Sequence, residues 1–189
     1  MTTHAPSGGK RSKAPELVID RPIVLVGMMG SGKSSVGKRL AARLSLPFFD
    51  ADDEIESAAG LKISEIFERY GEPHFRDGER RVIQRLMEAG PCVLATGGGA
   101  FVQPETRQRI LENGIAIWLD VPLPILVERT ARRSHRPLLN QGNPREILAR
   151  LLEERGPAYA EAHLRVKTDQ TPHARAVEAI VTLLREYLA

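Results

Sequence analysis

The chain has 189 residues, 42% of them hydrophobic, which predicts one domain with a single sizeable core. Its net charge is +3, but residues 1–21 carry four basic against two acidic residues, so only +1 falls on the rest and nucleic-acid binding is not indicated. No stretch approaches the ~18 apolar residues of a membrane span, and the N-terminus lacks the apolar region of a secretory signal, so we expect a cytoplasmic protein without nucleic-acid or membrane partners.

Residues 1–20 combine Gly, Ser, Pro and Lys with few apolar residues, and we expect them to form a disordered tail. A short transit peptide is the alternative for this basic start, but the segment shows no amphipathic period. The folded domain is therefore expected to cover residues 21–189.

From Pro22 onward, short apolar runs alternate with segments of helical period. We expect strands at Ile23–Val26, Phe48–Phe49, Cys92–Ala95, Ile115–Leu119 and Leu164–Lys167. We expect helices over residues 32–45, 63–70, 74–89, 104–112, 122–132, 144–156 and 174–188. Five strands separated by helices predict an α/β fold, in which a five-stranded parallel sheet has helices on both faces.

The segment after the first expected strand, residues 27–34, reads GMMGSGKS and matches the Walker A pattern G-x-x-x-x-G-K-[ST] of P-loop NTPases. Glycines let backbone N–H groups turn toward a β-phosphate, and the following helix adds the positive end of its dipole. A lysine here contacts the β- and γ-phosphates, and the next hydroxyl binds Mg²⁺. A glycine-rich turn with a solvated lysine is the simpler alternative. We assign to ATP binding Gly27, Gly30, Ser31, Gly32, Lys33, Ser34 and Ser35.

Carboxylates follow the second expected strand, at the edge where open parallel sheets bind ligands. Asp50 and Asp52 are two residues apart, so in an extended chain their side chains point the same way and can serve one site. The alternative is an acidic helix N-terminus, favoured by the helix dipole, which suits Asp53 and Glu54 better.

The third expected strand bears on compartment and on nucleotide chemistry. Cys92 is the only cysteine, which excludes an intramolecular disulfide and, beside Val93 and Leu94, favours a buried packing role in a reducing compartment. The strand ends in Thr96 in place of the aspartate expected of many ATPases. GTPases generally contain D-x-x-G and N-K-x-D, and neither string occurs in this chain. A kinase is therefore favoured over a GTPase switch, although both share the Walker A segment.

Together, five motifs resemble those of shikimate kinase in order and spacing: the Walker A segment, FDAD at 49–52, GEPHFR at 71–76, GGG at 97–99 and RPLL at 136–139. The resemblance covers about residues 22–168. It implies the fold of nucleoside monophosphate kinases, with a substrate-binding helical region near 50–80 and a lid near 130–145. It also implies that ATP phosphorylates the 3-hydroxyl of shikimate. A gluconate-type or nucleotide-type kinase is the alternative, but neither needs paired arginines around a carboxylate.

The same resemblance implies roles for individual residues. Asp52 would bind the shikimate hydroxyls, Arg76 and Arg155 its carboxylate, and Asp50 would hold Mg²⁺ through water. The catalytic set would be Lys33, Asp52 and Arg136. Further contacts are implied for Gly97, Gly98 and Gly99 beside the substrate ring, for Arg129 along the adenine and for Arg136 on the phosphates.

Spacing alone leaves simpler interpretations for the charged residues. Arg76 and Glu79 are three residues apart on one helical face, so Glu79 either orients Arg76 or forms only a surface ion pair with it. Arg155 could be a cation in the last helical turn before Gly156. Three consecutive glycines cost chain entropy, which favours a close backbone approach over a flexible link. We expect a monomer that uses ATP, Mg²⁺ and shikimate.

Overall fold

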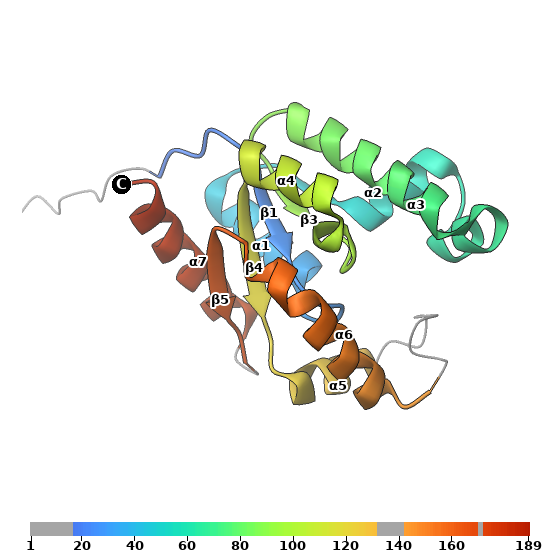
Figure 1. The fold of residues 1–189 in the computed structure, drawn as a ribbon. Coiled ribbons are helices and arrows are strands. Elements are labelled where there is room, and N and C mark those ends of the chain that lie inside the picture. Colours follow the sequence, from blue (N-terminus) through green and yellow to red (C-terminus); the bar gives the residue numbers. More distant parts are fainter. Residues whose placement is uncertain (1–16, 132–141, 170–171) are drawn as a thin grey trace, which may run out of the picture.

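The computed structural model describes residues 17–131, 142–169 and 172–189 (Figure 1). Within these ranges five strands form one sheet in the order β2-β3-β1-β4-β5, and every neighbouring pair is parallel. The strands are β1 (Ile23–Val26), β2 (Phe48–Asp50), β3 (Val93–Ala95), β4 (Ile115–Asp120) and β5 (Leu164–Lys167). The predicted five-stranded parallel sheet is confirmed.

Helices cover both faces of the sheet (Figure 1). They are α1 (Lys33–Leu44), α2 (Ala51–Ala59), α3 (Ile63–Glu88), α4 (Pro104–Asn113), α5 (Leu123–Ala131), α6 (Pro144–Tyr159) and α7 (His173–Tyr187), with a 3-10 turn η1 at Ala100–Val102. No helix among the described residues is long and apolar enough to cross a membrane.

Strand β1 shows why its sequence is apolar without interruption. Ile23 and Leu25 pack in one core cluster with residues of α1 and α7, whereas Val24 and Val26 pack in the other with residues of α3, α4 and α6. Successive side chains of a strand point to opposite faces, so a strand covered on both sides is apolar at every position. Its carboxyl end therefore rests on a rigid, fully buried support.

Two local features of α2 and α3 shape the region beside β2. Helix α2 was not among the predicted helices; it begins directly after Asp50, whose side chain accepts a hydrogen bond from the Asp52 backbone N–H and caps it. Helix α3 is broken at Gly71, where φ is 80° and ψ is 173°. This break confirms the prediction of two helical segments on either side of it.

The predicted end of α6 is wrong. We expected the helix to end at Gly156, but it continues through Pro157 to Tyr159, and the Ala160 backbone N–H donates to the Gly156 carbonyl at 2.9 Å. Glycine before proline has no Cβ to clash with the ring, which removes part of the usual penalty. The extra turn carries Tyr159, fully buried, into the core. Arg155 therefore lies within the helix and does not mark its end.

At the other end of the described chain, packing begins with Leu17 and Ile19. Both are partly buried against the core cluster that contains Leu184, although they fall in the segment expected to be a tail. Cys92 is buried as predicted, and burial raises the pKa of its thiol to about 11.

Candidate active site

The segment of residues 27–34, which we call the phosphate loop, connects β1 to α1. Gly27, Gly30 and Gly32 all have positive φ, at 139°, 81° and 91°. A Cβ on Gly27 would lie 2.8 Å from the Leu119 carbonyl oxygen, and one on Gly30 would lie 2.9 Å from the Thr130 methyl carbon. Both the backbone angles and the space therefore require glycine.

Lys33 lies folded against the carbonyl oxygens of this loop. Its Nζ donates hydrogen bonds to the Gly27 carbonyl at 2.8 Å, the Met28 carbonyl at 2.9 Å and Ser31 Oγ at 3.4 Å. The side chain is buried, so these acceptors stabilise a charge that water reaches poorly. Phosphate oxygens are stronger acceptors for an ammonium group than neutral carbonyls, so the lysine can exchange one set for the other.

The two residues predicted to hold magnesium lie in contact. Ser34 Oγ donates to Asp50 Oδ2 at 2.5 Å, which joins the start of α1 to the end of β2. Hydroxyl and carboxylate oxygens suit Mg²⁺, which keeps several waters and binds few protein groups together with substrate phosphates. No cluster of three or more His, Cys, Asp or Glu residues suited to a metal occurs in the described parts of the chain. The pair therefore fits a Mg²⁺ ion that arrives with a nucleotide.

Asp52 reaches the site by a different route from the predicted one. The expected extended chain over Asp50 and Asp52 is wrong, because Asp52 belongs to the first turn of α2. Its carboxylate nevertheless lies beside Gly97, where an added Cβ would be 3.0 Å from Asp52 Oδ1 and 2.9 Å from Glu79 Oε1. Asp52 therefore belongs to an acidic helix N-terminus and also lies at the site, so these two interpretations of the sequence do not exclude each other.

Residues Gly97–Gly99, which we call the glycine wall, follow β3 and are approached by two arginines. A Cβ on Gly98 would lie 3.3 Å from Arg155 Nη1, and one on Gly99 would lie 2.5 Å from Arg76 Nη2. Any larger residue would displace these guanidinium groups. The structure thus brings together residues from α2, α3 and α6 that are far apart in sequence: Asp52, Arg76, Glu79 and Arg155.

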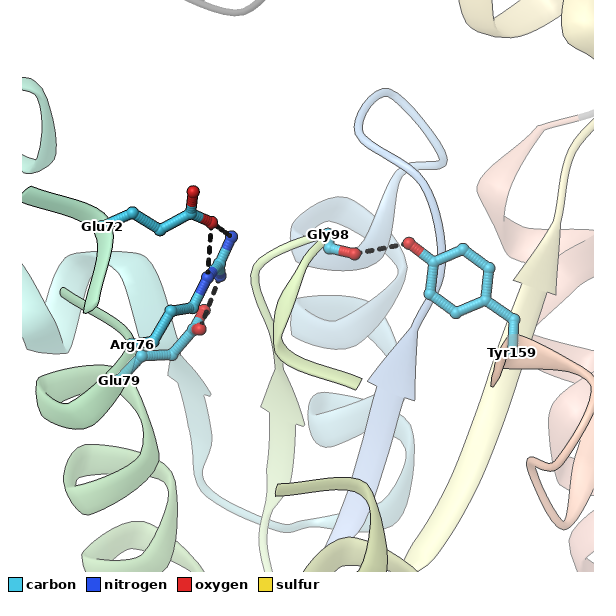
Figure 2. Close-up of polar contacts among 5 residues, drawn as sticks. All are labelled: Glu72, Arg76, Glu79, Gly98 and Tyr159. Carbon is cyan, nitrogen blue, oxygen red and sulfur yellow. Dashed lines mark hydrogen bonds and ion pairs between the residues drawn. The ribbon is translucent and has the colours of Figure 1, made fainter. Parts of the chain in front are cut away.

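Arg76 is paired with two glutamates (Figure 2). Its Nη1 donates to Glu79 Oε2 at 2.7 Å, while Nε and Nη2 both donate to Glu72 Oε1 at 3.2 Å. Burial disfavours the charged guanidinium, but the charges of Glu79 and Glu72 outweigh it and raise the pKa of Arg76. Burial raises the pKa of Glu79, against the opposing effect of Arg76. Glu79 is buried and Arg76 is partly buried, so the pair is not the surface ion pair considered from sequence.

Tyr159 fixes the glycine wall from the opposite side (Figure 2). Its hydroxyl donates to the Gly98 carbonyl at 2.5 Å, and its ring packs 6.0 Å from that of Trp118. Burial raises the pKa of this hydroxyl, which stays a neutral donor. The sequence predicted no role for Tyr159, since an aromatic residue after a proline gives no signal of what it will bind.

The segment after β5 contributes residues that sequence reasoning missed. Arg129 Nη2 donates to the Asp169 carbonyl at 3.0 Å, and a Cβ on Gly32 would lie 3.2 Å from the His173 ring. Burial and the charges of Arg129 and Arg39 lower the pKa of His173. Their position after the last strand could have indicated them, because the carboxyl end of that strand lies at the same sheet edge as the phosphate loop.

Arg136 and the rest of the RPLL motif lie outside the described residues. Among the described ones, the Walker A segment on a parallel sheet defines a P-loop nucleotide-binding protein. The charged acceptor region beside it, together with the missing GTPase strings, places the chain among P-loop kinases of small molecules.

Comparison with known proteins identifies the family. The sequence model for shikimate kinase matches residues 29–185. The chain is 51% identical to the shikimate kinase of Rhodopseudomonas palustris across 99% of this chain and 94% of that relative. It is 57% identical to the shikimate kinase of Caulobacter vibrioides across 88% and 83% of the two chains. The chain belongs to the shikimate kinase family.

Solved structures agree with this result. Shikimate kinase from Acinetobacter baumannii in complex with shikimate is 40% identical, with a TM-score of 0.85 over 88% of this chain and 94% of that one. A gluconokinase from Sinorhizobium meliloti has a TM-score of 0.55 at 19% identity, over 88% of this chain and 93% of that one. The second likeness shows that the fold is shared with gluconokinase, and it shows nothing further.

Proposed function

We propose that the protein transfers the γ-phosphoryl group of ATP to the 3-hydroxyl of shikimate, giving shikimate 3-phosphate and ADP. The observation that carries this proposal is the pair of guanidinium groups, Arg76 and Arg155, against adjacent residues of the glycine wall. Guanidinium groups present paired donors that match a carboxylate. Shikimate carries one carboxylate and several hydroxyls, and Asp52 lies at the same wall to accept hydrogen bonds from hydroxyls.

On the nucleotide side, the phosphate loop would hold the phosphates through its backbone N–H groups. Lys33 would leave the loop carbonyls for the β- and γ-phosphate oxygens, neutralising charge that builds during transfer. Ser34 and Asp50 would hold Mg²⁺, which, when bound, neutralises phosphate charge. By family resemblance, Arg129 would lie along the adenine and Arg136 on the phosphates.

On the acceptor side, Asp52 would accept a hydrogen bond from the attacking hydroxyl and take its proton as the bond to phosphorus forms. Phosphoryl transfer passes through a loose transition state, so the main contribution of the protein is to hold the hydroxyl in line. Asp52 is suited to this because α2 fixes it from its first turn. The site must exclude water during transfer, or ATP would be hydrolysed.

The ring of the substrate would lie against the glycine wall. Tyr159 holds that wall by its hydrogen bond to Gly98, while Glu79 holds Arg76 from beneath. With the carboxylate fixed by Arg76 and Arg155, a single hydroxyl would be directed at Asp52. This is how a rigid site selects one of several similar hydroxyl groups.

A coupled assay of ADP release tests the proposal, with shikimate, gluconate and AMP offered separately at equal concentration. We expect turnover with shikimate alone, and a phosphorylated product whose 3-position is identified by NMR. Turnover with gluconate or AMP at a comparable kcat/KM would contradict the proposal. We also propose a monomer, which light scattering after size exclusion can check.

A further inference from the structure

The contacts of Arg76 reveal a second role for its surroundings (Figure 2). Glu72 binds the edge of the guanidinium formed by Nε and Nη2, with both nitrogens 3.2 Å from Glu72 Oε1. Glu79 binds the other side, through Nη1. The Nε and Nη2 edge is one that arginine uses to grip a carboxylate with two parallel hydrogen bonds. A glutamate of the chain itself therefore occupies donors that suit a ligand carboxylate.

The two glutamates differ in how freely they can leave Arg76. The side chain of Glu79 is 2% exposed, so moving it would strand a buried charge. The side chain of Glu72 is 60% exposed and lies just beyond the break at Gly71. Exposed ion pairs are weak, because water and salt replace the partner at little cost. Glu79 is thus a fixed partner of Arg76, and Glu72 is a replaceable one.

The charges around Arg76 favour such a replacement. Two carboxylates and one guanidinium give this triad a net charge of −1 when all three are ionised. A ligand carboxylate that joined the triad would raise this to −2 around one guanidinium. If Glu72 turns into solvent as the ligand carboxylate arrives, the charge stays at −1 and the same donors are used again. Arg155 lies beside the neighbouring Gly98 and adds attraction for a ligand carboxylate, an attraction that Glu72 does not receive.

We propose that Glu72 occupies the donor edge of Arg76 in the empty enzyme and gives it up to the carboxylate of the substrate. This inference rests on the proposed function. Glu72 acts through Arg76 and is a positioning residue. It competes only with a ligand that brings its own ionised carboxylate, because a neutral ligand cannot replace the charge that Arg76 would lose, so Glu72 lowers affinity for the carboxylate ligand alone. Its effect falls on substrate affinity and leaves the transfer step unchanged.

The test compares Glu72→Gln with Asp77→Asn, which removes the same charge from the same helix. Asp77 pairs with Arg80 and Arg81 and has no contact with Arg76 among the described interactions. Each variant is assayed with shikimate and with its neutral methyl ester, and thermal melting verifies folding. Glu72→Gln is expected to lower KM for shikimate about three- to five-fold, with kcat and KM for ATP unchanged. KM for the ester should stay constant, and Asp77→Asn should match the unsubstituted enzyme.

Three results would overturn the inference, and they separate it from the proposed function. A rise in KM for shikimate in Glu72→Gln would mean that Glu72 helps to hold Arg76 for the substrate. An equal fall in both variants would reduce the effect to general surface charge. In these two cases the unsubstituted enzyme still discriminates shikimate from the ester, and the proposed function stands. If it does not discriminate them, the assignment of Arg76 and Arg155 to a carboxylate fails as well.

Discussion

The phosphate loop and the glycine wall lie at the same edge of the sheet but are built from different material. The loop is a continuous run of eight residues whose shape depends on backbone angles at three glycines and on one lysine held by loop carbonyls. The wall is three glycines surrounded by charged side chains from α2, α3 and α6. Phosphates are common to all nucleotides and can be held by a general device, whereas the acceptor must be selected by side chains particular to it.

The largest expected effect comes from a change in the phosphate loop. Lys33→Ala should reduce kcat by at least ~10³-fold, because a positive charge is lost from the phosphate that is transferred, in a site with little water. The steady-state assay of ADP release measures it, and circular dichroism verifies that the variant folds. Near-normal turnover in a folded protein would remove the phosphate loop from the mechanism.

The next largest effect is expected from Asp52→Asn, which changes the residue at the glycine wall that we assign to the attacking hydroxyl. We expect kcat to fall about 10²-fold or more, since a group that accepts the proton of the hydroxyl loses its charge. ATP affinity, measured by calorimetry, should stay within a few-fold, because Asp52 lies at the glycine wall. Loss of ATP binding with retained shikimate binding would require Asp50 and Asp52 to exchange roles.

Arg155→Lys tests the assignment of Arg155 to the carboxylate of shikimate. It keeps the charge but loses the paired donors. Transition-state stabilisation for shikimate should therefore fall by on the order of 1–3 kcal/mol, which lowers kcat/KM roughly 5- to 150-fold. The methyl ester should lose a similar amount on the unsubstituted enzyme. The two losses should not add, because both remove one interaction. Full additivity would show that Arg155 acts elsewhere.

The smallest expected effect is on the free energy of unfolding and concerns Glu79, beside the glycine wall. The pKa of Glu79 is raised above its ordinary value of 4.5, chiefly by burial. Its contribution to stability is therefore fully present below the unfolded pKa and is lost as pH rises through the folded pKa, by about 1.4 kcal/mol for each unit of elevation. Glu79→Gln should remove this loss.

Urea unfolding between pH 4.5 and pH 8 measures this difference. Asp77→Asn supplies a control, because a hydrogen bond from Arg80 lowers the pKa of Asp77 below its ordinary value of 3.8, so its contribution is lost only below that pH and should not change between pH 4.5 and pH 8. If the Glu79→Gln and unsubstituted proteins lose stability in parallel as pH rises, the Glu79 carboxylate is not penalised by burial.

The same contrast explains what could be predicted from sequence. The phosphate loop and the apolar strands are contiguous, so the pattern and its structure coincide. The glycine wall is assembled by tertiary packing, and spacing alone could not decide whether Arg76 was buried or exposed. Local rules failed where a tertiary contact outweighed them. Burial of Tyr159 extends α6 past a proline, and capping by Asp50 turns an expected extended segment into α2.

The buried thiol of Cys92 has a practical consequence for anyone who labels this enzyme. It is the sole cysteine, and a pKa of about 11 leaves almost no thiolate at neutral pH, so alkylating reagents and mild oxidants have no reactive sulfur in the folded state. A cysteine introduced on the surface of α2 or α3 would be the only site of modification. Fluorescent or spin probes could then report how these helices move as each substrate binds, with no background substitution needed.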